Sequence, residues 1–347
     1  MSRTDRLVQA ILSGDLDIPE SGDILVIRGA SGLLADVVEP ARLIFEQSFR
    51  PTHDALGRAG LRVTPCAEGP AMLAVVTLTR SRAENLGNVA RALALLPCGA
   101  TLVLDGAKTD GVDSLARQVG AALPLSGRYA KSHGLLAWLI RPAILPAAVA
   151  EWAAGAAPSR NADGHLTAPG LFSPEGPDPG SRRLAAALDG RLKGRVADLG
   201  AGWGWLASEA LARCPAITAI DLFDAEARAV DCARANVADP RATFHWADVR
   251  ILGKPAESYD AVIANPPFHQ GRAAEPDIGA AFIAAAARVM KASGRLLMVA
   301  NRQLPYEAAL DVAFARWERL SEDKLYKVLA ADRPRKPASP IRPRGDR

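Results

Sequence analysis

The 347-residue chain contains only four cysteines, which lie far apart at positions 66, 98, 214 and 232. No two of them form a CxxC pair, and the five histidines do not cluster with them, so we expect no metal site and no disulfide framework. The chain also lacks a run of 18 or more apolar residues and an N-terminal apolar segment with a cleavage site. We therefore expect a cytoplasmic protein without a membrane span.

Most of the chain has no excess of basic or acidic residues. Residues 1–157 carry 15 basic and 15 acidic side chains, and residues 158–332 carry 21 and 22. Residues 333–347 differ, with six basic residues, one acidic residue and several prolines. We expect this tail to be disordered, and its charge fits attraction to a polyanion such as RNA as well as a solvated terminus with no partner.

The composition, with 49% apolar and 23% charged residues, is that of a globular protein long enough for two domains. In the second half, apolar strands alternate with helices, which predicts an α/β fold with a parallel sheet covered on both faces. A short strand that runs into a glycine-rich turn is expected over 194–204, further strands at 216–223, 242–247, 259–264 and 294–300, and helices at 205–213, 225–237 and 278–291.

The first half repeats this pattern in a degenerate form. Residues 22–35 align with 194–207, 74–81 with 261–268, and 99–104 with 294–299. The site residues are not retained, however, since Val26, Arg28 and Ala30 replace Asp198, Gly200 and Gly202, and residues 74–81 lack the Asn-Pro-Pro-Phe sequence. We interpret this as an internal duplication, with chance similarity between short strands as the alternative. The predicted domains are 1–155 and 156–332, joined through a connector rich in proline and glycine at 153–181.

A glycine-rich turn follows the strand that begins at residue 194. Gly200, Gly202 and Gly204 have a G-x-G-x-G spacing, which differs from the dinucleotide pattern G-x-G-x-x-G. Asp198 precedes the first glycine, and its carboxylate would repel a pyrophosphate but suit a cationic ligand. S-adenosylmethionine carries an ammonium and a sulfonium group, so we predict that these four residues bind this cofactor.

Acidic residues also follow the next two strands. A carboxylate about 20 residues after a glycine loop can accept hydrogen bonds from both ribose hydroxyls. Asp224 and Asp221 both qualify; we favour Asp224, which leaves Asp221 facing solvent or capping a helix. Asp248 follows residues 242–247 and either accepts a hydrogen bond from the adenine amino group or is an ordinary turn aspartate.

The sequence Asn265-Pro266-Pro267-Phe268 interrupts a buried strand abruptly. Two prolines fix φ twice and remove two backbone donors, which makes a rigid corner. The Asn265 side-chain oxygen and the Pro266 carbonyl can accept both hydrogens of an exocyclic amine and so orient its lone pair. Phe268 can stack on a planar base. We predict that these four residues are catalytic, and the reaction requires no metal.

Several segments together resemble the RsmC-type ribosomal RNA guanine-N2 methyltransferases, which are class I S-adenosylmethionine-dependent enzymes. The resemblance covers nearly the whole chain except the tail. It is carried by residues 169–173 with 178 and 180–181, by 198–204, by NPPFHQG at 265–271, by NRQLPY at 301–306, and by KSHG at 131–134.

The resemblance implies two tandem Rossmann-like domains, of which only the second binds the cofactor, with Phe172, Ser181 and Asn265 contributing to its site. It implies that the first domain assists folding and binds RNA. The implied activity is methylation of guanine N2 in small-subunit (16S) ribosomal RNA, within the subunit or an assembly intermediate, by a monomer. Large-subunit guanine, adenine N6 and a protein glutamine amide remain alternative acceptors, and a non-catalytic RNA-binding assembly factor is the alternative outside the enzymes.

Overall fold

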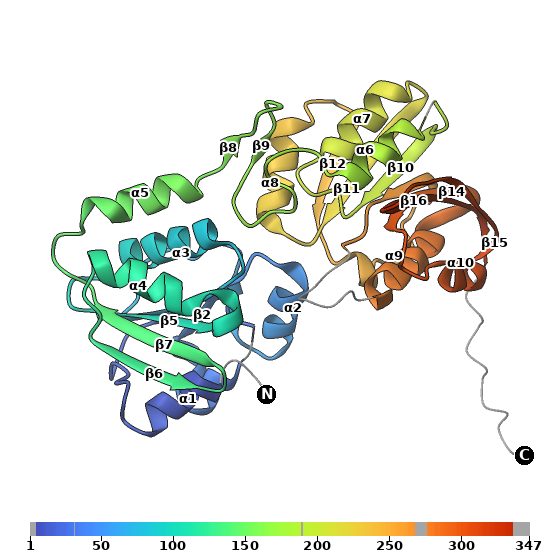
Figure 1. Cartoon of the computed structure of the whole chain (residues 1–347). Coiled ribbons are helices and arrows are strands. Elements are labelled where there is room, and N and C mark those ends of the chain that lie inside the picture. The colour runs from blue at the N-terminus through green and yellow to red at the C-terminus, as the bar shows by residue number, and fades with distance from the viewer. Residues whose placement is uncertain (1–4, 31, 189, 268–275, 336–347) are drawn as a thin grey trace, which may run out of the picture. The chain divides into compact units, whose positions relative to one another are not determined.

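The computed structural model describes residues 5–30, 32–188, 190–267 and 276–335. The chain forms two compact units, which follow one another from blue to red in Figure 1. The first unit comprises Met1–Pro174 together with Glu226–Arg228, and the second comprises Glu175–Ala225 and Ala229–Arg347. The first unit therefore extends past the predicted boundary at residue 155, and residues 175–181 of the predicted connector belong to the second unit.

The first unit contains a seven-stranded sheet in the order β3-β2-β1-β4-β5-β7-β6. Its helices are α1 Asp5–Leu12, α2 Arg50–Arg58, α3 Arg82–Leu95, α4 Val112–Ala122 and α5 Ala147–Ala156. Its strands are β1 Ile24–Ile27, β2 Leu43–Glu46, β3 Arg62–Thr64, β4 Leu73–Thr77, β5 Thr101–Ala107, β6 Gly127–Lys131 and β7 Gly134–Ile140, followed by the short pair β8 Ser159–Arg160 and β9 Leu166–Thr167.

The second unit contains a sheet with the corresponding order, β12-β11-β10-β13-β14-β16-β15. Its helices are α6 Pro179–Ala186, α7 Trp205–Arg213, α8 Ala227–Asn236, whose first two residues group with the first unit, α9 Pro276–Val289 and α10 Glu307–Ala313, with a 3₁₀ turn η4 at Val249–Ile251. Its strands are β10 Gly194–Leu199, β11 Ile217–Asp224, β12 Ala242–Trp246, β13 Tyr259–Ala264, β14 Met290–Asn301, β15 Phe314–Glu322 and β16 Tyr326–Pro334.

The equal strand orders confirm the predicted pair of tandem α/β folds. In each sheet five parallel strands are followed by an antiparallel pair at one edge. Two details of the prediction are wrong. Residues 290–291, expected in a helix, begin β14, and residues 333–334, expected in a disordered tail, complete β16, where Pro334 pairs with Phe314 of β15.

The second sheet is buried on both faces because neighbouring residues of a strand point to opposite sides. On β13, Val262 and Ala264 join the core formed with α9 and α10, whereas Ala261 and Ile263 join the core formed with α6 and α7. This explains why the central strands have continuous apolar sequences rather than alternating ones. None of the helices within the described ranges is long and apolar enough to cross a membrane.

The KSHG segment forms the turn between β6 and β7. Ser132 and His133 have φ values of 51° and 55°, which a two-residue hairpin of type I′ requires. Gly134 leaves room for the guanidinium of Arg6, since an added Cβ would lie 2.2 Å from its Nη1 atom. Arg6, from α1, donates to Asp105 Oδ1 on β5 at 2.7 Å through Nη2. The side chains of this ion pair are only 2% and 3% exposed.

Replacing Arg6 by Met should therefore strongly destabilise the first unit, because it breaks the buried ion pair between Arg6 and Asp105. We expect the free energy of unfolding to fall by about 3–5 kcal/mol in chemical denaturation. The control Arg62→Met removes the exposed ion pair with Asp23 and should cost no more than about 1 kcal/mol. Equal losses in the two variants would contradict the structural importance of the buried pair.

Candidate active site

Three neighbouring strands of the second sheet end at the same place. Leu199 of β10 pairs with Phe223 of β11 on one side and with Ala264 of β13 on the other. The chain extends the sheet from β10 toward β11 and β12, and then from β13 in the opposite direction. This reversal of strand order is where open α/β sheets bind ligands, beyond the carboxyl ends of the strands.

The glycine-rich turn leaves β10 at this point. Gly200, Gly202 and Gly204 have φ values of 76°, 57° and 89°, in the region that favours glycine. The Gly200 amide donates to the Phe223 carbonyl at 2.8 Å, which closes the turn against β11. At Gly204, where α7 begins, an added Cβ would lie 2.8 Å from Val237. The turn thus keeps its backbone close to the strand ends, as predicted for a ligand-binding loop.

Asp198, the last polar residue of β10, is fully buried. Neither of its carboxylate oxygens has a hydrogen-bond partner within the described part of the chain. Burial, and secondarily the negative charge of Asp224, raises the pKa of Asp198 to about 8. A buried carboxyl group without a partner is costly, and a cation placed beside it would restore its ionised form. This supports the predicted role of Asp198 toward a cationic ligand.

The two aspartates of β11 occupy different environments. Asp224 ends the strand, and its Oδ2 atom accepts a hydrogen bond from the Gly202 amide at 2.8 Å. Asp221 lies inside the strand, where it accepts hydrogen bonds from Tyr259 Oη at 2.7 Å and Arg195 Nη2 at 2.9 Å. The expectation that Asp221 faces solvent or caps a helix is therefore wrong. Its carboxylate links three strands, which favours Asp224 as the candidate ribose ligand.

Polar side chains surround the Asp221 carboxylate. Burial would raise the pKa of Asp221, but hydrogen bonds from His245, Thr243, Tyr259 and Arg195 lower it well below its usual range. Tyr259 in turn has a raised pKa, because it is buried and donates to this carboxylate. These contacts give Asp221 a structural role within the sheet.

Asp248 caps the 3₁₀ turn that follows β12. It accepts hydrogen bonds from the backbone amide of Arg250 at 3.0 Å and from that residue's guanidinium at 2.9 and 2.8 Å. This is the behaviour of an ordinary turn aspartate. Its contact with an adenine amino group stays a prediction.

Asn265 directly follows β13, and its side-chain nitrogen is held by two acceptors on or beside α6. Nδ2 donates to Ser181 Oγ at 2.8 Å and to Asp178 Oδ2 at 3.1 Å. Since a carboxylate can only accept, this contact determines which way the amide faces. The Oδ1 atom is buried and has no partner among the residues described. Asn265 thus presents a fixed, unsatisfied hydrogen-bond acceptor.

The remaining predicted site residues are placed as follows. Pro266 is buried and Pro267 is partly buried, directly after Asn265. Phe268 lies outside the described residues. Phe172 belongs to the first unit and is exposed, so its role at the cofactor stays a prediction. Ser181 contacts Asn265, which gives it a positioning contact that the sequence did not predict.

Asp178 contributes to the family resemblance, but the sequence did not predict it as a site residue, and the structure adds it to the candidate site. It caps α6 by accepting from the Ser181 amide at 3.0 Å, and Pro179 occupies the first turn of that helix. Asp followed by Pro at the start of a helix is a recognisable capping signal. The signal predicts the helix start, but not that the second function of the carboxylate is to hold Asn265.

The fold and this group of residues at the strand ends define a class I methyltransferase. The model of the methyltransferase small domain family matches residues 165–330. The ribosomal RNA small subunit methyltransferase C of Escherichia fergusonii is 32% identical over 242 residues, which cover 69% of each chain. The protein of the same name from Klebsiella pneumoniae is 30% identical over 237 residues, covering 68% of each. The chain therefore belongs to the ribosomal RNA small subunit methyltransferase C family, which confirms the predicted resemblance.

A solved structure extends the likeness over both units. The T. thermophilus 16S rRNA N2 G1207 methyltransferase, in complex with AdoMet and guanosine, matches with a TM-score of 0.75 and 23% identity. The match covers 91% of this chain and 90% of that chain. At this identity it supports the tandem fold.

The raised pKa of Asp198 predicts a pH dependence of stability. An unfolded aspartate ionises near pH 4, whereas the folded carboxyl retains its proton to about pH 8. Between these values the folded state binds the extra proton, so the free energy of unfolding falls as the pH rises.

Asp198→Asn should remove this fall in the free energy of unfolding, because asparagine does not ionise. At pH 8 and without ligand, we expect the variant to be more stable than the unsubstituted chain by about 1–3 kcal/mol, with the difference shrinking toward pH 5. Chemical denaturation at several pH values measures this, with the exposed Asp231→Asn as control. If the free energy of unfolding changed with pH in the same way for the unsubstituted chain and Asp198→Asn, the raised pKa of Asp198 would be contradicted.

Proposed function

We propose that the second unit binds S-adenosylmethionine at the ends of β10 and β11 and methylates the N2 amine of a guanine in small-subunit ribosomal RNA. The observation that carries this proposal is the unsatisfied Oδ1 atom of Asn265, whose orientation Asp178 and Ser181 determine. Family membership supports ribosomal RNA as the substrate, and the cytoplasm is the expected location.

The residues at the ends of β10 and β11 suit the cofactor. Asp198 is a buried carboxylate with no hydrogen-bond partner among the described residues, and it can bind the positively charged amino group of the cofactor. The glycine-rich turn allows close approach of a ligand to the backbone, and Asp224 offers a carboxylate to the ribose hydroxyls. When bound, S-adenosylmethionine supplies a methyl group that its sulfonium makes electrophilic. The protein therefore needs to hold and orient the acceptor rather than to activate it with a metal.

The Asn265 corner is suited to an exocyclic amine. The lone pair of such an amine is conjugated with its aromatic ring, so the amine must be oriented before it can act as a nucleophile. Asn265 Oδ1 and the Pro266 carbonyl can accept its two hydrogens, which directs the lone pair out of the ring plane. Because guanine N2 is hidden in the groove of a helix, we expect a flipped or single-stranded base, with Phe268 stacking on it.

The identity of the acceptor is supported by the relatives. They are named as small-subunit ribosomal RNA enzymes, and the T. thermophilus protein as a methyltransferase of guanine N2 at G1207. These names favour guanine N2 over large-subunit guanine, adenine N6 and a glutamine amide. The retained polar groups of the second unit disfavour a non-catalytic assembly factor.

The direct test is to map modified guanines in ribosomal RNA by mass spectrometry, in cells with and without the gene. We expect one N2-methylguanine of the small subunit to disappear when the gene is absent and to return with the intact gene. A methylated adenine, a large-subunit guanine or a protein glutamine that disappears instead would replace this acceptor. An unchanged RNA and protein methylation pattern would refute the proposed activity.

Asn265→Ala should abolish methyl transfer while leaving cofactor affinity within a few fold, because the residue is assigned to the acceptor. Turnover on small-subunit RNA and calorimetric titration with S-adenosylmethionine separate the two effects. Asn161→Ala, in a turn of the first unit, is the matched control and should retain turnover. Near-normal turnover of Asn265→Ala would refute this role.

A further inference from the structure

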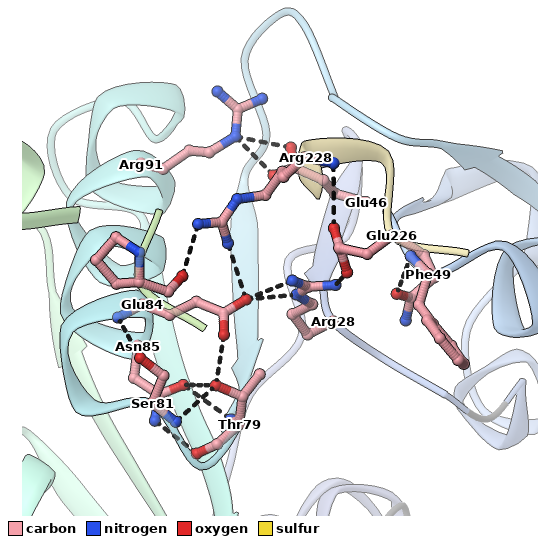
Figure 2. A network of polar contacts seen from close by, with 12 residues as sticks. Arg28, Glu46, Phe49, Thr79, Ser81, Glu84, Asn85, Arg91, Glu226 and Arg228 are labelled. Atoms are coloured by element: carbon pink, nitrogen blue, oxygen red, sulfur yellow. Dashed lines mark hydrogen bonds and ion pairs between the residues drawn. The ribbon is translucent and has the colours of Figure 1, made fainter. Parts of the chain in front are cut away.

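Two arginines and two glutamates form a polar cluster in the first unit, which we call the Arg28 cluster: Arg28, Glu84, Glu226 and Arg228 (Figure 2). Arg28 donates to Glu84 Oε1 at 2.9 Å through Nε and to Glu226 Oε2 at 2.8 Å through Nη1. Arg228 Nη1 donates to the same Glu84 oxygen at 3.0 Å. The side chain of Glu84 is only 4% exposed, so these contacts are well shielded from solvent.

Arg28 occupies the place in the first sheet that Gly200 has in the second. Its amide donates to the Glu46 carbonyl of β2 at 2.9 Å, as the Gly200 amide donates to the Phe223 carbonyl of β11 at 2.8 Å. Its φ of 61° is in the same left-handed region as the 76° of Gly200. The first copy has thus kept the backbone of the turn, while a charged side chain now extends from it toward Glu84 and Glu226 (Figure 2).

The segment Glu226–Arg228 is held at several further points within this unit. Glu226 forms an antiparallel bridge with Phe49. The Ala227 amide donates to the Ser48 carbonyl at 2.9 Å, and Arg228 Nη2 donates to the Pro169 carbonyl at 2.7 Å. Each of its three residues therefore has a contact that fixes its position within the first unit.

This segment is also directly connected to the candidate ribose ligand. Asp224 ends β11, and only Ala225 separates it from Glu226. The Ala225 carbonyl accepts a hydrogen bond from Trp246 Nε1 at 2.8 Å, which limits the movement of the chain between Asp224 and Glu226. A displacement of Glu226 would therefore be transmitted to Asp224, because consecutive Cα atoms have a fixed separation.

We propose that Arg28 and Glu84 are positioning residues for cofactor binding, which hold Glu226–Arg228 and thereby set the position of the Asp224 carboxylate. The proposal rests on the proposed function, in which Asp224 binds the ribose of S-adenosylmethionine. The degenerate glycine turn of the first copy thus contributes to the binding site of the second copy without touching the ligand.

The charges of the cluster explain why Arg28 is the critical member. Burial alone would lower the pKa of Arg28, but the charges of Glu226 and Glu84 raise it, so its guanidinium stays charged. Without that guanidinium, Glu226 loses its contact with Arg28 and the buried Glu84 keeps only one of its two arginines. Loss of one partner from a buried ion pair is strongly unfavourable, and movement of Glu226 toward solvent relieves it.

The test is Arg28→Met in the full chain, with S-adenosylmethionine as the ligand. We expect its Kd, by calorimetry, and its KM to rise about tenfold, with kcat at saturating S-adenosylmethionine within about twofold of the unsubstituted value. Arg28→Lys should restore part of the affinity, because it retains the charge but not the forked geometry.

Arg91→Met is the matched control. Arg91 pairs with Glu46 at 2.7 Å in the same unit, and its hydrogen bonds and ion pair within the described part of the chain involve no residue of Glu226–Arg228. It should lower the melting temperature while leaving the Kd unchanged. If Arg28→Met does not fold, Glu226→Gln replaces it, since this change removes the charge, keeps the shape, and should raise the Kd in the same direction.

Three outcomes are decisive. A Kd that rises in Arg28→Met but not in Arg91→Met supports the positioning role. Equal Kd values in the two variants, whatever their melting temperatures, would overturn it and leave the cluster a purely structural role. Failure of the unsubstituted chain to bind S-adenosylmethionine would refute the proposed function itself, and the positioning role with it.

Discussion

The arrangement of the site depends on one constraint: parallel strands that are neighbours in a sheet end at the same edge. Leu199, Phe223 and Ala264 are at matched positions of β10, β11 and β13. The glycine turn, Asp224 and Asn265 follow these residues and therefore converge, although they are distant in the sequence. Each polar group needs only to follow its strand directly, so the sheet positions them all at once.

The two copies show which part of this arrangement a sheet retains when the side chains at its central turn differ. The hydrogen bond from the turn to the neighbouring strand is present in both, with Arg28 in one and Gly200 in the other. This bond serves the backbone, which must be satisfied in any buried turn. The residues that would face a ligand have diverged, since Val26 replaces the buried aspartate. Fold and site have therefore changed independently within one chain.

The sequence allowed the fold class, the strand ends and most site residues to be predicted, because these depend on local patterns. The strand at 259–264 and the helix at 205–213 were predicted with the observed bounds. The contacts of Asn265 with Asp178 and of Asp221 with Arg195 and Tyr259 could not be predicted in this way. They join residues from different elements, and their register is set by packing of the sheet, to which local periodicity gives no access.

The same holds for the short segment Glu226–Arg228. In the sequence it lies at the start of the alanine-rich segment 225–237, which is expected to be a helix, and no feature distinguishes it from the rest of that segment. Its membership of the first unit depends on contacts with residues that lie far away along the chain, such as Arg28 and Glu84. Only the three-dimensional structure shows that these three residues group with the first unit, although the residues before and after them belong to the second.

The contact between Asn265 and Asp178 also has a consequence for selectivity. An asparagine amide can normally rotate and offer either its NH₂ group or its oxygen, so it does not discriminate between partners. Here the Asp178 carboxylate removes that ambiguity, and Asn265 presents only its oxygen as a free acceptor among the described residues. Oδ1 would accept a hydrogen bond from a base edge that carries hydrogen and would repel a base edge that carries a carbonyl. A guanine bound beside Asn265 as proposed would therefore be recognised by its amino edge rather than its keto edge before any methyl group moves.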